Sequence, residues 1–254
     1  MKNKEINKLS KDELKNKVSS LKKDLFNFRF RKVNGQLDDP SKVSKLKKDV
    51  AKLLTRLNKK NIHEYNFAYG LIKQIPEQSN LFIGNSLMIR AFDSFTDRNS
   101  KDIRIFSNRG TSGIDGNIST ALGMANSSVK NNYLVIGDQS FMHDIGSLQI
   151  LTSKNINLTI FIINNYGGAI FDGLPLSKAM NQPIFKKFIR CQHSYNFKKI
   201  IESYDLKYNE IHSIEDLDNN DLKLSGVNIN EVFINSEETI RFLQDFPSWN
   251  FQAH

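Results

Sequence analysis

The sequence has little cysteine and no long apolar run. Cys191 is the only cysteine among 254 residues, which excludes an internal disulfide and favours a reducing compartment. No apolar run approaches the ~20 residues that a membrane-spanning helix needs. The basic N-terminus lacks the apolar stretch of a secretory signal. With 39% hydrophobic and 25% charged residues, the composition is that of a globular protein, and we expect it in the cytoplasm, without a membrane partner.

Charge is distributed unevenly along the chain. Residues 1–61 contain 19 Lys and Arg against 7 Asp and Glu, whereas residues 62–254 contain 17 against 20. Such a split favours two modules with different partners, the first of them polyanionic. The short polar segment 59–63 is the expected boundary, which gives modules 1–61 and 62–254.

The basic module has the pattern of two amphipathic helices. Ser10 and Glu13 have the spacing of a capping box. Apolar residues then recur every three or four positions, as on one helical stripe: Leu14, Val18, Leu21, Leu25 and Phe28, and again Val43, Leu46, Val50, Leu53 and Leu57. Between the stripes, Asn34-Gly35 favours a turn, and Asp39-Pro40 favours a new helix start. The pattern predicts an antiparallel two-helix hairpin.

Basic side chains occupy the outer faces of these two helices. The candidates for RNA contact are Lys15, Lys22, Arg29, Arg31, Lys45, Lys48, Lys52 and Arg56. Charge alone leaves open a solvated lysine-rich surface, a coiled-coil partner or nucleic-acid binding.

The amino-acid sequence of residues 1–61 favours one of these alternatives. Leu9–Leu14, Leu25–Arg31, Asn34–Leu37 and Lys47–Thr55 resemble ribosomal protein L twenty-nine of the large subunit, over the full length of that family. The resemblance implies contact with large-subunit rRNA and with a neighbouring ribosomal protein, and hence ribosome association. Where that family usually has arginines in its second helix, this chain has Lys47, Lys48 and Lys52. Lysine makes point-charge rather than bidentate phosphate contacts, so strongly salt-dependent binding is expected.

The second module alternates short apolar runs with helical stretches. Runs typical of buried strands are Leu81–Gly84, Ile103–Phe106, Tyr133–Ile136, Leu158–Ile163 and Glu231–Ile234. Helical stretches are expected at Ser86–Phe95, Gly113–Asn126, Phe141–Ser153, Phe197–Tyr204 and Glu237–Leu243. Apolar strands that alternate with helices predict a doubly wound parallel α/β domain.

Polar residues follow two of these strands where ligands bind in such a sheet. Asp138 follows one strand and Asn165 follows the next, 27 positions later. The Asp138 carboxylate, the Asn165 amide oxygen and the Gly167 carbonyl would offer Mg²⁺ three hard oxygen ligands, with diphosphate oxygens completing the shell. Gly137 would allow close approach of the anion, and a helix from Ser140 would direct N–H groups at it.

Each piece alone has a plainer interpretation, because Asp138 could only cap a helix and 164–167 could be an ordinary turn. The joint pattern of Gly-Asp, a 27-residue gap and Asn-Asn is similar to the Mg²⁺–diphosphate motif of thiamine-diphosphate enzymes. More narrowly, Gly84–Arg90, Ser107–Gly116, Gly137–Asp144 and Asn164–Phe171 look like the MenD family of menaquinone-pathway synthases. That family joins decarboxylated 2-oxoglutarate to isochorismate, and the likeness covers its last, diphosphate-binding domain.

The MenD resemblance implies roles for particular residues. It implies that Asp138, Asn165 and Gly167 hold Mg²⁺ and thiamine diphosphate. It implies that three residues contact the substrate, namely Ser86, Arg90 and Arg109. It also implies a thiazolium pocket that is lined by Ile114, Ile170, Phe171 and Leu174. Arginine forks suit dicarboxylic substrates. The alternative is that both arginines pair with local acids such as Asp93 or Asp115.

The family's catalytic glutamate belongs to a pyrimidine-binding domain, which we expect to be absent from these 254 residues. Three interpretations then remain open. The chain is a ribosomal protein with an appended, non-functional domain; or it is a subunit of a split synthase whose pyrimidine-binding domain is supplied in trans; or it is a composite reading frame without a joint function. On each of them we expect the isolated chain to be catalytically inactive. A homodimer contact or a pyrimidine-domain partner is expected on residues 62–254.

Overall fold

The structure is a computed structural model that describes residues 3–6, 9–33, 40–57, 61–96, 101–152, 156–222 and 225–244. The predicted turn at Asn34-Gly35 and the first two residues of the predicted boundary at 59–63 lie outside the described residues. No described helix is long and apolar enough to cross a membrane.

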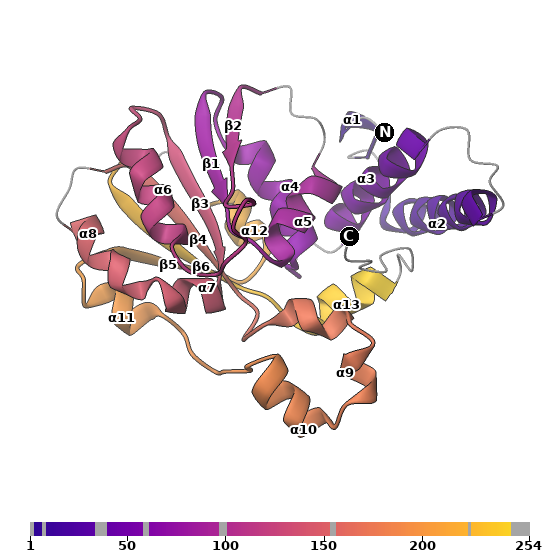
Figure 1. Ribbon diagram of the computed structural model, residues 1–254. Coiled ribbons are helices and arrows are strands. Elements are labelled where there is room, and N and C mark those ends of the chain that lie inside the picture. Colours follow the sequence, from indigo (N-terminus) through magenta and orange to yellow (C-terminus); the bar gives the residue numbers. More distant parts are fainter. Residues whose placement is uncertain are drawn as a thin grey trace.

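A six-stranded parallel sheet forms the centre of the molecule (Figure 1). Its strands are β1 (Ser79–Ile83), β2 (Ile103–Phe106), β3 (Asn132–Gly137), β4 (Leu158–Asn164), β5 (Lys207–Ile211) and β6 (Val227–Phe233). They lie in the order β2-β1-β3-β4-β6-β5, and every neighbouring pair is parallel. The chain runs outward from β1 to β2 and then returns to β3 on the other side of β1. This reversal is the place where doubly wound sheets bind ligands.

Helices cover both faces of the sheet, which confirms the predicted α/β class. The longer helices are α2 (Lys11–Val33), α3 (Pro40–Leu57), α4 (Glu64–Gln74), α5 (Leu87–Phe95), α6 (Asn117–Asn126) and α13 (Ser236–Gln244). The shorter ones are α1 (Asn3–Ile6), α7 (Asp138–His143), η1 (Ile145–Ser147), α8 (Leu148–Thr152), η2 (Ala169–Gly173), α9 (Leu176–Ala179), α10 (Gln182–Ile184), η3 (Phe185–Ile189), α11 (Lys198–Glu202) and α12 (Ile214–Asp218).

Alternation along each strand divides the apolar side chains between two cores. In β1, Leu81 packs in the core under α4, α5 and α12, whereas its neighbour Phe82 packs in the core under α6, α7, α8 and α11. In β4, Phe161 and Ile162 are divided in the same way. Strands buried on both faces explain the continuous apolar runs in the sequence.

The N-terminal helices pack against the first of these cores. The predicted capping box is present, because Ser10 N donates to Glu13 Oε2 at 2.7 Å and Glu13 N donates to Ser10 Oγ at 3.3 Å. Apolar residues of both predicted stripes share one core with α4, and α3 contacts both α4 and α5. Figure 1 shows α3 beside α4 and α5. The antiparallel hairpin stays a prediction, because its turn lies outside the described residues.

Helix α4 begins at a buried histidine cap, directly after the predicted boundary. His63 Nδ1 accepts from Asn66 N at 3.3 Å, and Asn66 Oδ1 accepts from His63 N at 2.8 Å. At the other end of α4, Lys101 Nζ donates to the carbonyls of Lys73 and Ile75, which places a cation at the negative end of the helix dipole. Polar groups therefore satisfy both ends of this helix.

Burial lowers the pKa of His63 from 6.5 to about 3. As the pH falls below 6.5, the unfolded chain takes up a proton that the folded chain does not. His63 therefore lowers the free energy of unfolding by about 1.4 kcal/mol per pH unit between pH 6.5 and about 3. Asparagine is also a good N-cap, so His63→Asn is expected to remove this slope. Urea unfolding from pH 7 to 5 measures it, with exposed His143→Asn as the matched control; equal slopes in wild type and His63→Asn would contradict the prediction.

Several elements differ from the prediction. The helix expected at Gly113–Asn126 begins only at Asn117, and the one expected at Phe141–Ser153 is divided into α7, η1 and α8. Helix α4 and strand β5 were not predicted. All nine residues from Glu64 to Ile72 are buried, so α4 has no polar face and no helical periodicity. Strand β5 is an edge strand, mostly exposed, and has no apolar run.

Candidate functional site

A cavity of about 280 Å³ lies at the carboxyl ends of β1, β3 and β4. Most of the predicted cofactor residues line it, together with one predicted substrate residue: Gly137, Asp138, Ser140, Asn165, Gly167, Ile114, Ile170, Phe171 and Ser86. Leu174, Arg90 and Arg109 are not among its lining residues. The parallel sheet therefore brings both predicted strand ends to one cavity.

Asp138, the first residue of α7, presents a buried carboxylate to this cavity. It is 2% exposed. Its Oδ1 accepts from Gln139 N at 2.6 Å, and its Oδ2 accepts from Gly167 N at 2.8 Å. Oδ2 also lies 3.1 Å from His193 Nε2. Each carboxylate oxygen has two acceptor directions, and the N–H groups alone therefore leave room for a cation.

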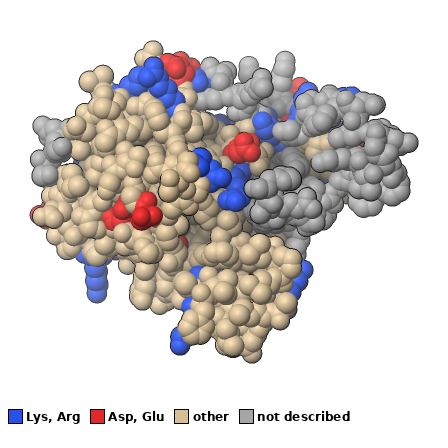
Figure 2. Space-filling view, viewed as in Figure 1, with Lys and Arg blue, Asp and Glu red and all other residues tan. Residues whose placement is uncertain are grey.

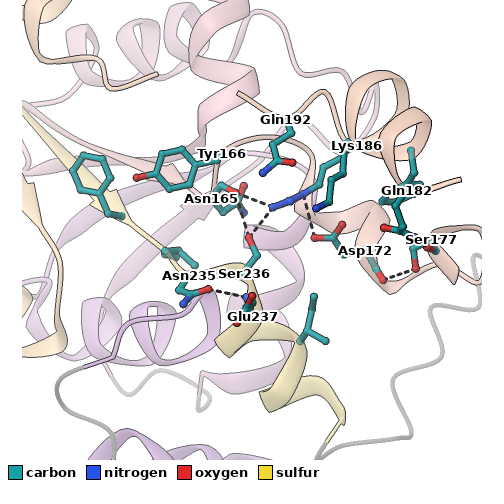
Figure 3. A pocket seen from close by; sticks show the side chains of 15 residues that line it. Asn165, Tyr166, Asp172, Ser177, Gln182, Lys186, Gln192, Asn235, Ser236 and Glu237 are labelled. Atoms are coloured by element: carbon teal, nitrogen blue, oxygen red, sulfur yellow. Dashed lines mark hydrogen bonds and ion pairs between the residues drawn. The ribbon is translucent and has the colours of Figure 1, made fainter. Parts of the chain in front are cut away.

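Asn165 is held through both its side chain and its backbone. Its Nδ2 donates to Glu64 Oε1 at 2.8 Å. Its backbone carbonyl accepts from Arg190 Nη2 at 2.9 Å and from Ser236 Oγ at 3.2 Å. Figure 3 shows Asn165 and Ser236 joined across a neighbouring cavity of about 650 Å³. The amide oxygen Oδ1 accepts no hydrogen bond from the residues that the structure describes.

Gly167 allows the chain to turn tightly between Asn165 and the wall of the cavity. Its φ is +128°, a region that side-chain-bearing residues rarely adopt. A Cβ atom there would lie 2.6 Å from Arg190 O and 3.0 Å from Cys191 O. Ser86 (φ 73°), Tyr166 (φ 61°) and Cys191 (φ 48°) also have positive φ at or beside the cavity. Strained backbone of this kind gathers at functional sites.

The donor set suits Mg²⁺. One carboxylate, one amide oxygen and backbone carbonyls are hard oxygen ligands, and Mg²⁺ uses few protein ligands when phosphate oxygens complete its shell. The described residues contain no group of three or more His, Cys, Asp or Glu side chains placed for a metal. A phosphate-completed Mg²⁺ site needs no such group.

Two further ionic groups support Asn165. Burial raises the pKa of Glu64, opposed by hydrogen bonds from Thr239 and Asn165. Burial likewise raises the pKa of Asp172, opposed by the Arg190 guanidinium, whose Nε lies 3.2 Å from Asp172 Oδ2. Arg190 therefore connects Asp172 and Ser236 to the Asn165 carbonyl.

The predicted substrate arginines lie beside the cavity. Arg90, on α5, donates from Nη1 to the backbone oxygen of Ser86, the N-cap residue of that helix, at 2.8 Å. Arg109 Nη1 donates to Asn85 Oδ1 at 3.1 Å. Both arginines thus contact the segment 85–86 that follows β1, and their predicted substrate contacts remain predictions.

The candidate RNA-binding residues are described only in part. Lys15 and Lys45 are exposed, and Lys22, Lys48 and Lys52 are half-buried, with Lys52 Nζ 4.0 Å from Asp49 Oδ1. The side chains of Arg29, Arg31 and Arg56 lie outside the described residues. In Figure 2 the visible face of the α/β part is mostly uncharged, with basic and acidic residues in small separate groups.

Three residues at the site were not predicted from the sequence: Glu64, Arg190 and His193. Glu64 is 101 positions from Asn165, and His193 is 55 positions from Asp138. Glu64 is the first residue of α4 and His193 lies between η3 and α11, and neither belongs to a sequence motif. Only the fold brings Glu64 and Arg190 to the cavity and His193 to Asp138.

Comparisons with known proteins agree with both resemblances. Residues 83–223 match the family described as "Thiamine pyrophosphate enzyme, C-terminal TPP binding domain", and residues 4–60 match "Ribosomal L29 protein". Similar curated proteins are 2-succinyl-5-enolpyruvyl-6-hydroxy-3-cyclohexene-1-carboxylate synthases. That of Lysinibacillus sphaericus is 34% identical over 71% of this chain and 31% of its own length. That of Desulfitobacterium hafniense is 37% identical over 73% and 34%, and that of Listeria monocytogenes 37% over 70% and 30%.

The chain thus spans about a third of the length of the curated relatives it matches. The family match covers more than half of this chain and includes both strand ends and the Gly167 turn. It confirms thiamine diphosphate with Mg²⁺ as the predicted cofactors. The chain belongs to the thiamine pyrophosphate enzyme family through its C-terminal TPP-binding domain, which follows a segment that matches a ribosomal protein family.

Proposed function

We propose that residues 62–254 form the diphosphate- and Mg²⁺-binding half of a MenD-type synthase, and that residues 1–61 form an RNA-binding module. The observation that carries the first part is the convergence of Asp138, Asn165 and Gly167 on one cavity at the carboxyl ends of β3 and β4. When bound, thiamine diphosphate supplies a carbanion-stabilising ring.

The described residues have separate tasks in this proposal. Asp138, Asn165 and Gly167 hold the cation and its diphosphate. Ile114, Ile170, Phe171 and Leu174 surround the thiazolium ring. Ser86, Arg90 and Arg109 bind the carboxylates of 2-oxoglutarate and isochorismate, because arginine pairs bidentately with carboxylates.

The active site is completed in trans by a pyrimidine-binding domain on another chain. Several large exposed apolar side chains favour a protein partner. Ile114 and Phe171, which line the cavity, are each 38% exposed, and Phe106, Leu176, Ile184 and Phe188 are 40%, 44%, 46% and 65% exposed. Apolar surface of this kind marks interaction sites.

Calorimetry with the purified full chain tests the proposal. The chain is expected to bind thiamine diphosphate only with Mg²⁺ present and, alone, to release no CO₂ from 2-oxoglutarate. A separate pyrimidine-binding domain from a MenD-type enzyme is expected to restore turnover on mixing. Decarboxylation by the chain alone would contradict the claim that a second chain completes the active site. Absence of Mg²⁺-dependent binding of thiamine diphosphate would contradict the proposed role of residues 62–254.

The RNA-binding role rests on the ribosomal family match over residues 4–60. Cosedimentation with large ribosomal subunits is expected to weaken steeply as salt rises. Because α3 packs on α4 and α5, charge reversal is a cleaner test than deletion of residues 1–61. Lys15→Glu with Lys45→Glu is expected to abolish cosedimentation, and the equally exposed pair Lys178→Glu with Lys199→Glu is expected to leave it unchanged. Equal losses in both pairs would contradict a specific role for the module.

A further inference from the structure

Glu64 is a wholly buried carboxyl group that the predicted cofactor motif does not include. It is 0% exposed and is the first residue of α4. Its Oε1 accepts from Asn165 Nδ2 at 2.8 Å, and its Oε2 accepts from Thr239 Oγ1 on α13. Glu64 also lines the cavity that holds the candidate cation ligands. Three segments distant in the sequence therefore meet at this one side chain.

The contact determines how the Asn165 amide is turned. A carboxyl oxygen in this position accepts a hydrogen bond, so the NH₂ group of Asn165 must face it, and the amide oxygen is left on the other branch. If the amide were reversed, two oxygens would face each other in a buried site, at the cost of an unmade hydrogen bond.

We propose that Glu64 is a positioning residue for the cation site, which holds Asn165 so that Oδ1 remains available to Mg²⁺. The inference rests on the proposed function. Groups that orient metal ligands through a hydrogen bond typically change metal affinity 10- to 100-fold when they are removed. Glu64 therefore contributes to cation affinity without contact to the cation, the diphosphate or the substrate.

The chain contains a matched pair for comparison. Glu231 is also 0% exposed, and its Oε1 accepts from Nδ2 of Asn164, the residue before Asn165. Glu231 does not line the cavity. Substitutions at Glu64 and Glu231 therefore remove the same kind of buried group, but only the first releases a candidate cation ligand.

The test uses the full chain with thiamine diphosphate and Mn²⁺ in place of Mg²⁺, followed by electron paramagnetic resonance. Glu64→Met is expected to raise the Mn²⁺ concentration at half-saturation at least about tenfold and to alter the spectrum of bound Mn²⁺. Glu64→Gln retains an acceptor for Asn165 Nδ2 and is expected to restore wild-type behaviour. Glu231→Met is expected to lower stability without a change in Mn²⁺ half-saturation.

Each outcome bears on the proposal. Wild-type half-saturation in Glu64→Met, or an equal shift in Glu231→Met, would overturn it while the proposed function stands. A wild-type chain that binds no Mn²⁺ would overturn both. If Glu64→Met does not fold, Thr239→Val serves instead, because it removes the hydroxyl that holds Oε2. It is expected to shift half-saturation in the same direction by a smaller factor, and no shift would overturn the proposal.

Discussion

Replacement of Asp138 by asparagine is expected to abolish Mg²⁺-dependent binding of thiamine diphosphate. Asp138 is the one carboxylate among the three candidate ligands. An amide in its place removes the negative charge and offers only one oxygen, whereas Gln139 N and Gly167 N now donate to two. We expect affinity to fall more than about 100-fold, beyond the range for groups that only orient a ligand. Calorimetric titration with thiamine diphosphate at a fixed Mg²⁺ concentration measures the loss.

Asp93→Asn is the control for Asp138→Asn, because Asp93 is exposed on α5. It is expected to bind the cofactor as wild type does. Thermal unfolding of both variants without cofactor separates a lost ligand from a lost fold. A folded Asp138→Asn variant with wild-type affinity would show that the cation is held elsewhere.

Replacement of Gly167 by alanine is expected to lower stability and cofactor binding together. The new Cβ would lie 2.6 Å from Arg190 O, a backbone atom that cannot move away as a flexible side chain can. The φ of +128° adds backbone strain. We expect a loss of about 3 kcal/mol or more in the free energy of unfolding, measured by urea titration.

Gly146→Ala provides the matched control, because a Cβ at Gly146 meets nothing within 4 Å and its φ is not positive. It is expected to be neutral or slightly stabilising. A Gly167→Ala variant as stable as wild type would mean that the segment 190–191 moves away from Gly167 without cost.

The strands that the sequence predicted best are those buried on both faces. Leu158–Asn164 is apolar over almost its whole length because helices cover both sides of β4, so composition alone identifies it. Strand β5 was not predicted because it lies at the sheet edge, where Lys207 and Glu210 face solvent and no apolar run is present. Helix α4 escaped because burial on all sides removed the polar stripe by which helices are recognised.

The site divides in the same way. The convergence of Asp138, Asn165 and Gly167 on one cavity could be predicted, because the carboxyl ends of neighbouring parallel strands lie at one edge of the sheet. Glu64 and His193 could not, because a hydrogen bond across 101 or 55 positions leaves no local pattern. The first group follows from spacing along the chain, and the second only from the three-dimensional arrangement.

The packing of α3 on α4 has a thermodynamic consequence if the chain binds both a polyanion and the cofactor, as proposed. Helix α4 begins with Glu64, whose carboxyl group touches Asn165, and its buried surface is completed in part by the basic module. A polyanion that binds only the docked form of α3 favours that form by its binding free energy. If the polyanion changes the affinity of the chain for Mg²⁺–thiamine diphosphate by some factor, the cofactor must change the affinity for the polyanion by the same factor. In that case, ligand binding to one half of the chain would change the ligand affinity of the other half, although no ligand contacts both halves.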